Sequence, residues 1–455
     1  MTSLATPDLA HVLIALAALL LCAHCMGSLF VRYRQPRSMG EVLGGLLLGA
    51  TGLGWIWPSA QSWLFPAGSS TAVVLGAVYQ LGLLLLLFIA GSELRTVFPR
   101  GERRTVAAVF AAGMCIPFMA GLGISQLIDQ RSLWGPNGNA TSFVLVFSIA
   151  MAITSIPVIS RIMHDLGILD TAFARVVIGV AVLEDLVLYV VLAVAIGYAG
   201  GSGATLFGLP SALGIAGGSG DDMLYHVIVT IGFLAVFLVG GPPAYRWIGG
   251  LDANVIQRAT PVAHQLAFLI LTTAAALLLG LEAFFGAFVA GVVVAATEPR
   301  RSEATLAIRA FSLAFFIPIY FACIGLGLDL VTGFNVIFFA GFLVAACAIK
   351  AASVYVGARA AGEGGLASRN LAVAMNARGG PGIVVASTTF TAGIINQSFY
   401  ATLVLLAVLT SLAAGAYLER IPRERLMARR GEPRTGRAGV AGSIPDFAAS
   451  AGPNG

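Results

Sequence analysis

Long apolar runs separated by short polar segments make up most of the chain, and each run is about 20 residues long. A transmembrane α-helix needs about 20 apolar residues, whereas the strands of a membrane barrel alternate over about 10. We therefore predict an all-α polytopic membrane protein with about 13 transmembrane helices. The predicted spans cover residues 10–31, 40–57, 72–93, 105–127, 142–163, 172–199, 223–245, 263–280, 282–297, 309–330, 335–356, 368–393 and 399–418.

Composition supports this class. Hydrophobic residues make up 58% of the chain and charged residues 10%, against roughly 25% charged residues in a soluble domain. The net charge of +5 does not indicate nucleic-acid binding, because the arginines lie in short loops and in the C-terminal segment. The five cysteines fall in apolar runs, where packing is their expected role. The chain has no nucleotide-binding βαβ pattern, so we predict no enzyme, no cofactor and no tethered regulatory domain.

The arginines also predict an orientation. Loops that follow odd-numbered spans carry arginines, whereas 58–71, 200–222 and 394–398 carry no basic residue, and Arg131 is the lone exception among the other loops. By the positive-inside rule the odd-numbered loops are cytoplasmic. We predict a protein of the cell (inner) membrane with its N-terminus outside and its C-terminus in the cytoplasm. Residues 419–455 form a tail that is first basic and then small and polar, and we expect the last part to be disordered.

Similar stretches recur along the chain. Residues 40–49 (GEVLGGLLLG) are echoed by 285–294 (FGAFVAGVVV), and both predicted broken helices contain a proline, Pro157 and Pro381. An inverted repeat of six plus six spans, with a linker helix at 223–247, is typical of transporters. Similar composition of glycine-rich helices is the alternative explanation. The Gly45 to Gly49 spacing is a helix-packing motif that we expect between protomers.

Glu184 and Asp185 lie near the centre of the apolar run 172–199. A carboxylate at the bilayer centre costs about 2.5–3.5 kcal/mol and usually marks an ion or proton path. Lys350, the sole lysine of the chain, lies in the middle of another span, and a buried ammonium should pair with a carboxylate. Adjacent helical residues are about 100° apart, so one carboxylate can pair with Lys350 while the other faces a water-filled cavity. The spacing does not decide which does which.

Two spans contain breaks at membrane depth. In 142–163, Pro157 removes a helical donor beside the hydroxyls of Thr154 and Ser155. In 368–393, the sequence Asn-Ala-Arg-Gly-Gly-Pro-Gly predicts that Gly379–Gly382 cannot hold a regular helix. The residues predicted to form this break are Asn376, Arg378, Gly380 and Pro381. Carbonyls released by such breaks can coordinate a cation.

With these residues in place, residues 10–418 resemble the cation:proton antiporters of the Kef and Nap type. The matching motifs are Gln35-Pro36 with Gly40-Glu41, LLLFIAGSEL at 85–94, Thr154–Pro157, Glu184-Asp185, GAFVAG at 286–291, FFIPIYFACIGLGLDL at 315–330 and Lys350. The chain departs from the family in two places. The first acidic position is Glu, and Arg378 is followed by Gly-Gly where relatives often have Gly-Glu, so Arg378 lacks the expected charge partner.

The resemblance implies a homodimer in which each chain has a dimerising bundle (10–100 and 263–330) and a mobile ion-translocating core (104–199 and 335–418). It also implies crossed half-helices and an elevator-like motion. Asp185 would carry the cation, transiently, or the proton. Glu184 would pair with Lys350, and Thr154, Ser155 and the broken backbone would line the site.

We therefore expect antiport of a monovalent cation, Na⁺ or K⁺, against H⁺. One alternative is a gated cation channel, which needs a continuous pore and would pass cations without proton counterflow. Another is proton-coupled export of an organic solute, which needs aromatic side chains near the broken helices. The first break has none and the second has only Phe390 beyond it.

Overall fold

The computed structural model describes residues 4–33, 35–93, 102–155, 171–199, 220–250, 260–298, 302–331 and 334–421, together with a few isolated positions. In this part of the chain nine helical runs are long and apolar enough to cross a membrane. A tenth is added if α12 and α13, which are bent by 49°, form one span. The protein is therefore a multi-pass membrane protein built from helices. The count of thirteen spans and the inverted repeat stay predictions.

The helices of the first half follow the predicted spans closely. They are α1 (Thr6–Arg32), α2 (Arg37–Leu48), α3 (Leu53–Ile56), α4 (Pro58–Leu64), α5 (Ser70–Glu93), α6 (Arg103–Phe110), η1 (Ala111–Cys115), α7 (Ile116–Ser125), η2 (Gln130–Leu133), α8 (Ala140–Ala152) and α10 (Ala172–Ala199). The short helix α4 lies where we expected a loop.

The second half contains α12 (Gly220–Val239), α13 (Gly241–Gly250), α15 (Pro261–Leu278), α16 (Ala283–Thr297), α17 (Glu303–Phe311), η3 (Ser312–Phe316), α18 (Ile317–Leu326), α19 (Val336–Ala360), α20 (Gly365–Ala374), α21 (Gly379–Thr391) and α22 (Gln397–Glu419). Helices α6, η1 and α7 form one run, as do α17, η3 and α18. In each run a π-helical turn precedes an Ile-Pro pair, at Pro117 and at Pro318. Because proline cannot donate to the preceding turn, a local widening of the helix is the expected result.

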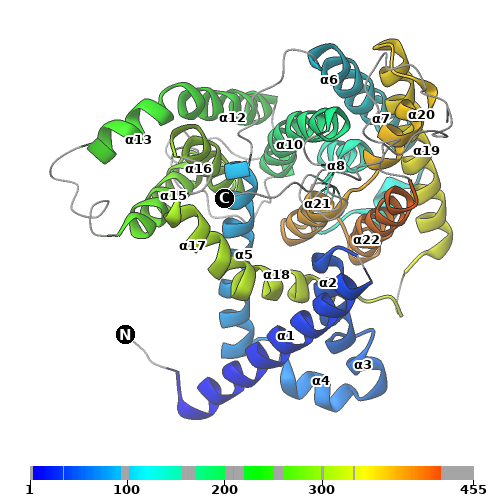
Figure 1. Ribbon diagram of the computed structural model, residues 1–455. Coiled ribbons are helices and arrows are strands. Elements are labelled where there is room, and N and C mark those ends of the chain that lie inside the picture. The colour runs from blue at the N-terminus through cyan, green and yellow to red at the C-terminus, as the bar shows by residue number, and fades with distance from the viewer. Residues whose placement is uncertain are drawn as a thin grey trace, which may run out of the picture.

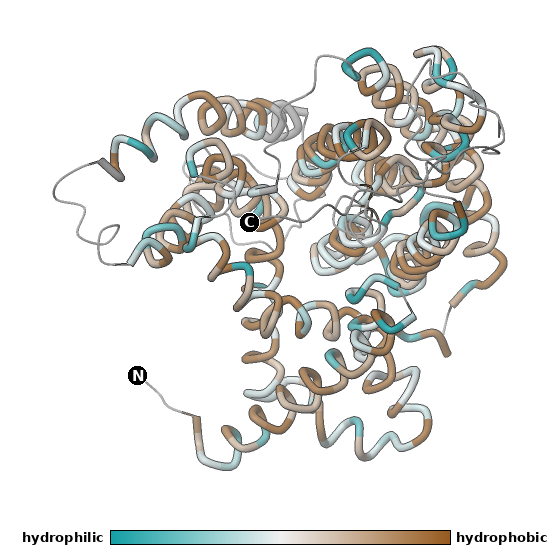
Figure 2. Tube along the Cα trace, in the orientation of Figure 1, coloured by the Kyte–Doolittle hydropathy of each residue, from teal (hydrophilic) through white to brown (hydrophobic). Residues whose placement is uncertain are grey.

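The helices pack in two groups (Figure 1). Helices α1, α2, α5, α12, α13 and α15–α18 pack against one another, and α6–α8, α10 and α19–α22 form the second group. Helix α10 also packs against α12 of the first group. The tubes are apolar over most of their length (Figure 2), as expected for helices that face either lipid or one another.

Glycines allow the closest helix crossings. A side chain at Gly45 of α2 would collide with the backbone of Ala322 in α18, and one at Gly91 of α5 would collide with Phe288 in α16. Small residues at such crossings let helix backbones approach each other in membranes. Our expectation that Gly45 packs between protomers is wrong, because its partner is α18 of the same chain.

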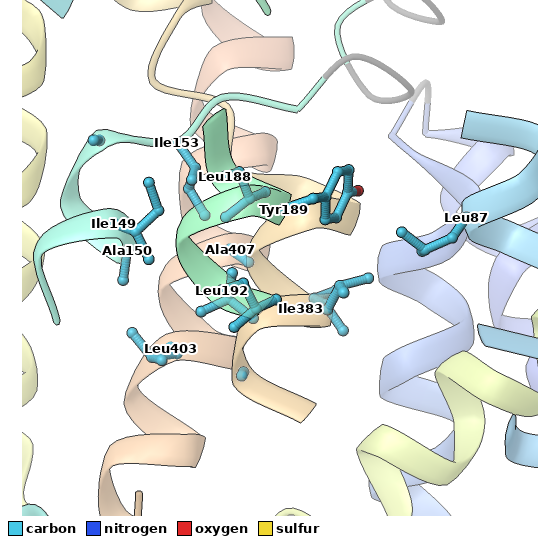
Figure 3. Packing of buried hydrophobic residues seen from close by; sticks show 14 of the residues in the cluster. Leu87, Ile149, Ala150, Ile153, Leu188, Tyr189, Leu192, Ile383, Leu403 and Ala407 are labelled. Atoms are coloured by element: carbon cyan, nitrogen blue, oxygen red, sulfur yellow. The ribbon is translucent and has the colours of Figure 1, made fainter. Parts of the chain in front are cut away.

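A continuous apolar core runs through both groups. Figure 3 shows Ile149 and Ile153 beside Leu188 and Leu192 of α10. These side chains surround the middle of α10, where the two adjacent carboxylates lie. The fold therefore places Glu184 and Asp185 in the interior of the protein, away from lipid.

Candidate functional site

Lys350 lies in the middle of α19 and its side chain is fully buried. Its Nζ donates to Glu184 Oε1 at 2.7 Å, to the carbonyl of Gly113 at 2.9 Å and to the carbonyl of Ala152. An ammonium has three donors, and here each has an acceptor. The structure thus pairs Lys350 with Glu184, the choice that helical spacing alone had left open.

Glu184 and Asp185 are both buried, at 0% and 1% exposure. Because they are neighbours on α10, their side chains leave the helix in different directions. Glu184 turns toward Lys350 on α19, and the Thr154 hydroxyl lies close to its carboxylate. We had expected one of the two carboxylates to face a water-filled cavity. In this conformation Asp185 is enclosed instead.

The first break lies at the end of α8. The helix stops at Ala152, and Ile153 is extended with φ −72° and ψ 154°. In a continuous helix the carbonyl of Ile153 would accept from residue 157, which is a proline without an N–H and with a ring that crowds this carbonyl, and this explains the early stop. Pro157 itself lies outside the described residues. The Thr154 hydroxyl donates to the carbonyl of Met375 at 2.6 Å.

The second break lies between α20 and α21, at Met375–Arg378. This corrects our expectation, because Gly379, Gly380, Pro381 and Gly382 form the first turn of α21 rather than the irregular segment. A proline in the first turn of a helix loses no hydrogen bond, so Pro381 is tolerated there.

The two breaks meet directly. The backbone N–H of Ser155 donates to the carbonyl of Ala377 at 2.6 Å, beside the bond from Thr154 to Met375. The extended segment 153–155 and the turn at 375–377 therefore lie against each other at the level of Glu184. In addition, Thr410 and Ser411 of α22 accept the N–H groups of Arg378 and Gly379 at the start of α21.

Arg378 is fully buried at this crossing. Its guanidinium donates to the carbonyls of Ala150 (3.2 Å) and Met151 (3.1 Å) at the end of α8, and to Ala346 of α19 (3.0 Å). It also contacts both oxygens of Asn376, each at 3.2 Å. The negative end of the α8 dipole is thus the partner of Arg378, which explains how the chain dispenses with an acidic residue after it.

The carbonyls at the break have protein partners. Arg378 and Lys350 together bind the last three carbonyls of α8, those of Ala150, Met151 and Ala152. Met375 and Ala377 accept from Thr154 and Ser155. Each of these five carbonyls accepts at least one hydrogen bond and keeps a second lone pair. The expectation that the broken backbone lines a cation site stays a prediction.

The sequence model of the family described as "Sodium/hydrogen exchanger, transmembrane" matches residues 14–423, nearly the whole chain. The chain belongs to this family.

Relatives and a solved structure agree with that membership. Cation/H(+) antiporter 20 of Arabidopsis thaliana is 28% identical over 87% of this chain, which spans 46% of that protein's length. Na(+)/H(+) antiporter NhaS4 of Synechocystis is 28% identical over 88% of this chain and 94% of the relative. The sodium proton antiporter MjNhaP1 of Methanocaldococcus jannaschii has a similar fold, with a TM-score of 0.61 at 13% identity over 90% of this chain and 97% of that structure.

One partner of Lys350 was not predicted from the sequence. The carbonyl of Gly113, which binds Lys350, lies in the π-helical turn η1. Pro117 follows four residues later and cannot supply the N–H that this carbonyl would accept in a regular helix. The four-residue spacing between Gly113 and Pro117 is the feature of the sequence that could have predicted this partner. Among the described residues no three His, Cys, Asp or Glu side chains gather as a metal cluster.

Proposed function

We propose that this member of the sodium/hydrogen exchanger family exchanges a monovalent cation, Na⁺ or K⁺, for H⁺ at Asp185. The observation that carries the proposal is the pair of buried carboxylates beside two crossing helix breaks, with Glu184 engaged by Lys350. Glu184 then has a fixed structural partner, and Asp185 is the carboxylate that alternates between a proton and a cation. The names of relatives such as NhaS4 and the Na(+)/H(+)-K(+) antiporter GerN of Bacillus cereus support this substrate class.

Charge balance supports alternating occupancy. Formally, two carboxylates and two cations, Lys350 and Arg378, cancel in the buried region. Protonation of Asp185 or binding of a cation beside it changes this sum by one positive charge in either case. One positive ligand neutralises the Asp185 carboxylate, whereas two at once would leave an excess positive charge beside it, which an interior of low dielectric penalises. Competition between H⁺ and the metal ion for one carboxylate is the coupling that antiport requires.

We further propose how the helices move. Residues 10–100 and 263–330 form the bundle that joins two protomers, residues 104–199 and 335–418 form the mobile core, and 223–247 links them. The two packing groups of Figure 1 support this division. An elevator-like displacement of the second group would carry Asp185 between the two sides while the crossing around Arg378 stays intact. The chain lies in the cell membrane with its N-terminus outside.

The test uses purified protein in liposomes that hold an imposed pH gradient, with Li⁺, Na⁺, K⁺ and Rb⁺ added in turn. We expect at least one of these cations to dissipate the gradient through the wild type, and Asp185→Asn to reduce the rate more than tenfold. Asp129→Asn, which alters an exposed loop carboxylate, is the matched control and should exchange normally. Exchange retained by Asp185→Asn, or no cation-dependent dissipation by the wild type, would refute the proposal.

A further inference from the structure

A cavity of about 220 Å³ lies where α5 and α18 meet α21 and α22. It is therefore lined by both packing groups. Its walls are mainly apolar and aromatic, and Phe390 stacks on Tyr400 with ring centroids 4.7 Å apart. Its oxygen-bearing side chains are Tyr79, Ser387, Thr391 and Tyr400, and Cys323 also lines it.

The cavity lies near one end of these helices. Leu75 and Gly76 belong to the first two turns of α5, whereas Leu326 and Gly327 lie at the end of α18. Of the connections at this end, 57–69 and 392–396 contain no arginine or lysine, and 126–139, which is hydrogen-bonded to 393–396, contains one, Arg131. By the positive-inside rule this is the outer side of the membrane.

Hydroxyl groups connect the cavity to the buried carboxylates. Tyr320 of α18 and Ser387 of α21 are hydrogen-bonded at 3.0 Å, and the ring of Tyr79 lies 5.0 Å from that of Tyr320. The phenol groups of Tyr79 and Tyr189 are both within electrostatic range of Tyr320. Tyr189 is one helical turn after Asp185 on α10 and interacts with it. Figure 3 shows the Tyr189 ring reaching from α10 toward α5, the helix that carries Leu87.

This line of hydroxyls crosses an otherwise apolar seam. Tyr189 and Tyr320 are 1% and 0% exposed, and burying a phenol oxygen among apolar groups is unfavourable unless it finds a partner. The Tyr320–Ser387 bond joins α18 of one group to α21 of the other. A bond across the seam holds the two groups together in the conformation seen here.

We propose that the cavity is the outer vestibule for the transported ions, and that the Tyr320–Ser387 bond is the closed gate between it and Asp185. The inference rests on the proposed exchange at Asp185. When the gate opens, Thr391 and Tyr79 offer hydroxyl oxygens to a monovalent cation, and Tyr189 continues the polar path to the carboxylate. The aromatic faces around the vestibule further favour a cation over an anion.

The vestibule is tested by thiol labelling. A chain with all five cysteines replaced by serine is given Gly327→Cys, at an exposed position that lines the cavity and has room for a side chain. It is placed in right-side-out vesicles, and a membrane-impermeant methanethiosulfonate reagent is added outside. We expect a mass shift for one label and at least a tenfold loss of exchange, whereas the cysteine-free parent is neither labelled nor inhibited. No labelling from this side, or labelling that leaves exchange unchanged, would overturn the vestibule. The mass shift measures the access of the reagent to the cavity even in a protein that does not exchange ions. The labelling result therefore does not depend on the proposed function.

The gate is tested by the dependence of exchange on outer cation concentration. Loss of one neutral hydrogen bond across the seam should increase the open fraction, and so lower the outer KM, about fivefold in Tyr320→Phe and Ser387→Ala. Tyr417→Phe is the matched control, because the Tyr417 hydroxyl on α22 donates to Asn370 of α20, within one packing group. Equal effects of Tyr320→Phe and Tyr417→Phe on the outer KM, or no effect of either, would contradict the gate.

Discussion

At the scale of single residues, the ammonium group of Lys350 binds groups from three helical segments. It binds a side chain of α10, the carbonyl at the end of α8 and a carbonyl released by the π-helical turn η1. Both charges of its pair with Glu184 are fully buried, so water cannot solvate one of them if the other is removed. The removal of one partner therefore destabilises the protein strongly, because it leaves the other charge buried and uncompensated.

A double-mutant cycle on this pair measures that cost. Lys350→Met and Glu184→Gln should each lower the free energy of unfolding by about 3–5 kcal/mol, because each leaves one buried charge uncompensated. The double variant should lose less than the sum of the two, since it leaves neither charge behind. Reversible unfolding in mixed detergent micelles gives the values. Strictly additive losses would show that the two side chains do not act as a pair.

At the scale of elements, the crossing of the two breaks depends on Arg378. Its planar guanidinium reaches carbonyls on α8 and α19 as well as Asn376 at the same time. It thereby holds the end of one half-helix against a neighbouring span and against the second break. A single ammonium has neither the geometry nor the number of donors for this arrangement.

Replacement of Arg378 by lysine should therefore destabilise the protein although the charge is kept. We expect Arg378→Lys to lower the free energy of unfolding by about 1–3 kcal/mol, the weight of one charged hydrogen bond left unmade in the interior. Arg246→Lys on the exposed side of α13 is the control and should be neutral. If both variants are equally stable, the guanidinium contacts do not hold the crossing.

Sequence reasoning located these elements better than their boundaries. The breaks were expected from Pro157 and from the Gly-Gly-Pro-Gly run, and both neighbourhoods do contain a break. The second lies four residues earlier than predicted, because glycine and proline fit the first turn of α21 and leave 375–378 irregular. The partners of Arg378 were not predictable, since backbone carbonyls of a distant helix end carry no side-chain signal. The role of Asp185 stays a prediction.

At the scale of the whole molecule, the pattern of apolar runs predicts a helical membrane protein. A continuous apolar run of about 20 residues can satisfy its backbone hydrogen bonds in a bilayer only as a helix. The run lengths could not reveal the close approach of α2 to α18 and of α5 to α16, which depends on where single glycines face. The loop charges predict which side each end occupies, and that prediction has a direct test.

Single cysteines in a cysteine-free chain test the orientation. Ser59→Cys lies on exposed α4 in a connection without basic residues, and Arg104→Cys lies at the exposed start of α6. In intact cells we expect an impermeant thiol reagent to label Ser59→Cys alone. Permeabilised cells should label both. The reverse pattern in intact cells would invert the proposed topology and place the Cys323 cavity on the cytoplasmic side.

The central claim is that H⁺ and a metal cation compete for the Asp185 carboxylate, and proton release on cation binding measures this most directly. Cation is added to detergent-solubilised protein in weakly buffered solution containing a pH indicator dye. We predict that wild type releases protons in a saturable manner and that Asp185→Asn releases none, whereas Asp129→Asn behaves as wild type. Undiminished, saturable proton release from Asp185→Asn would contradict the account.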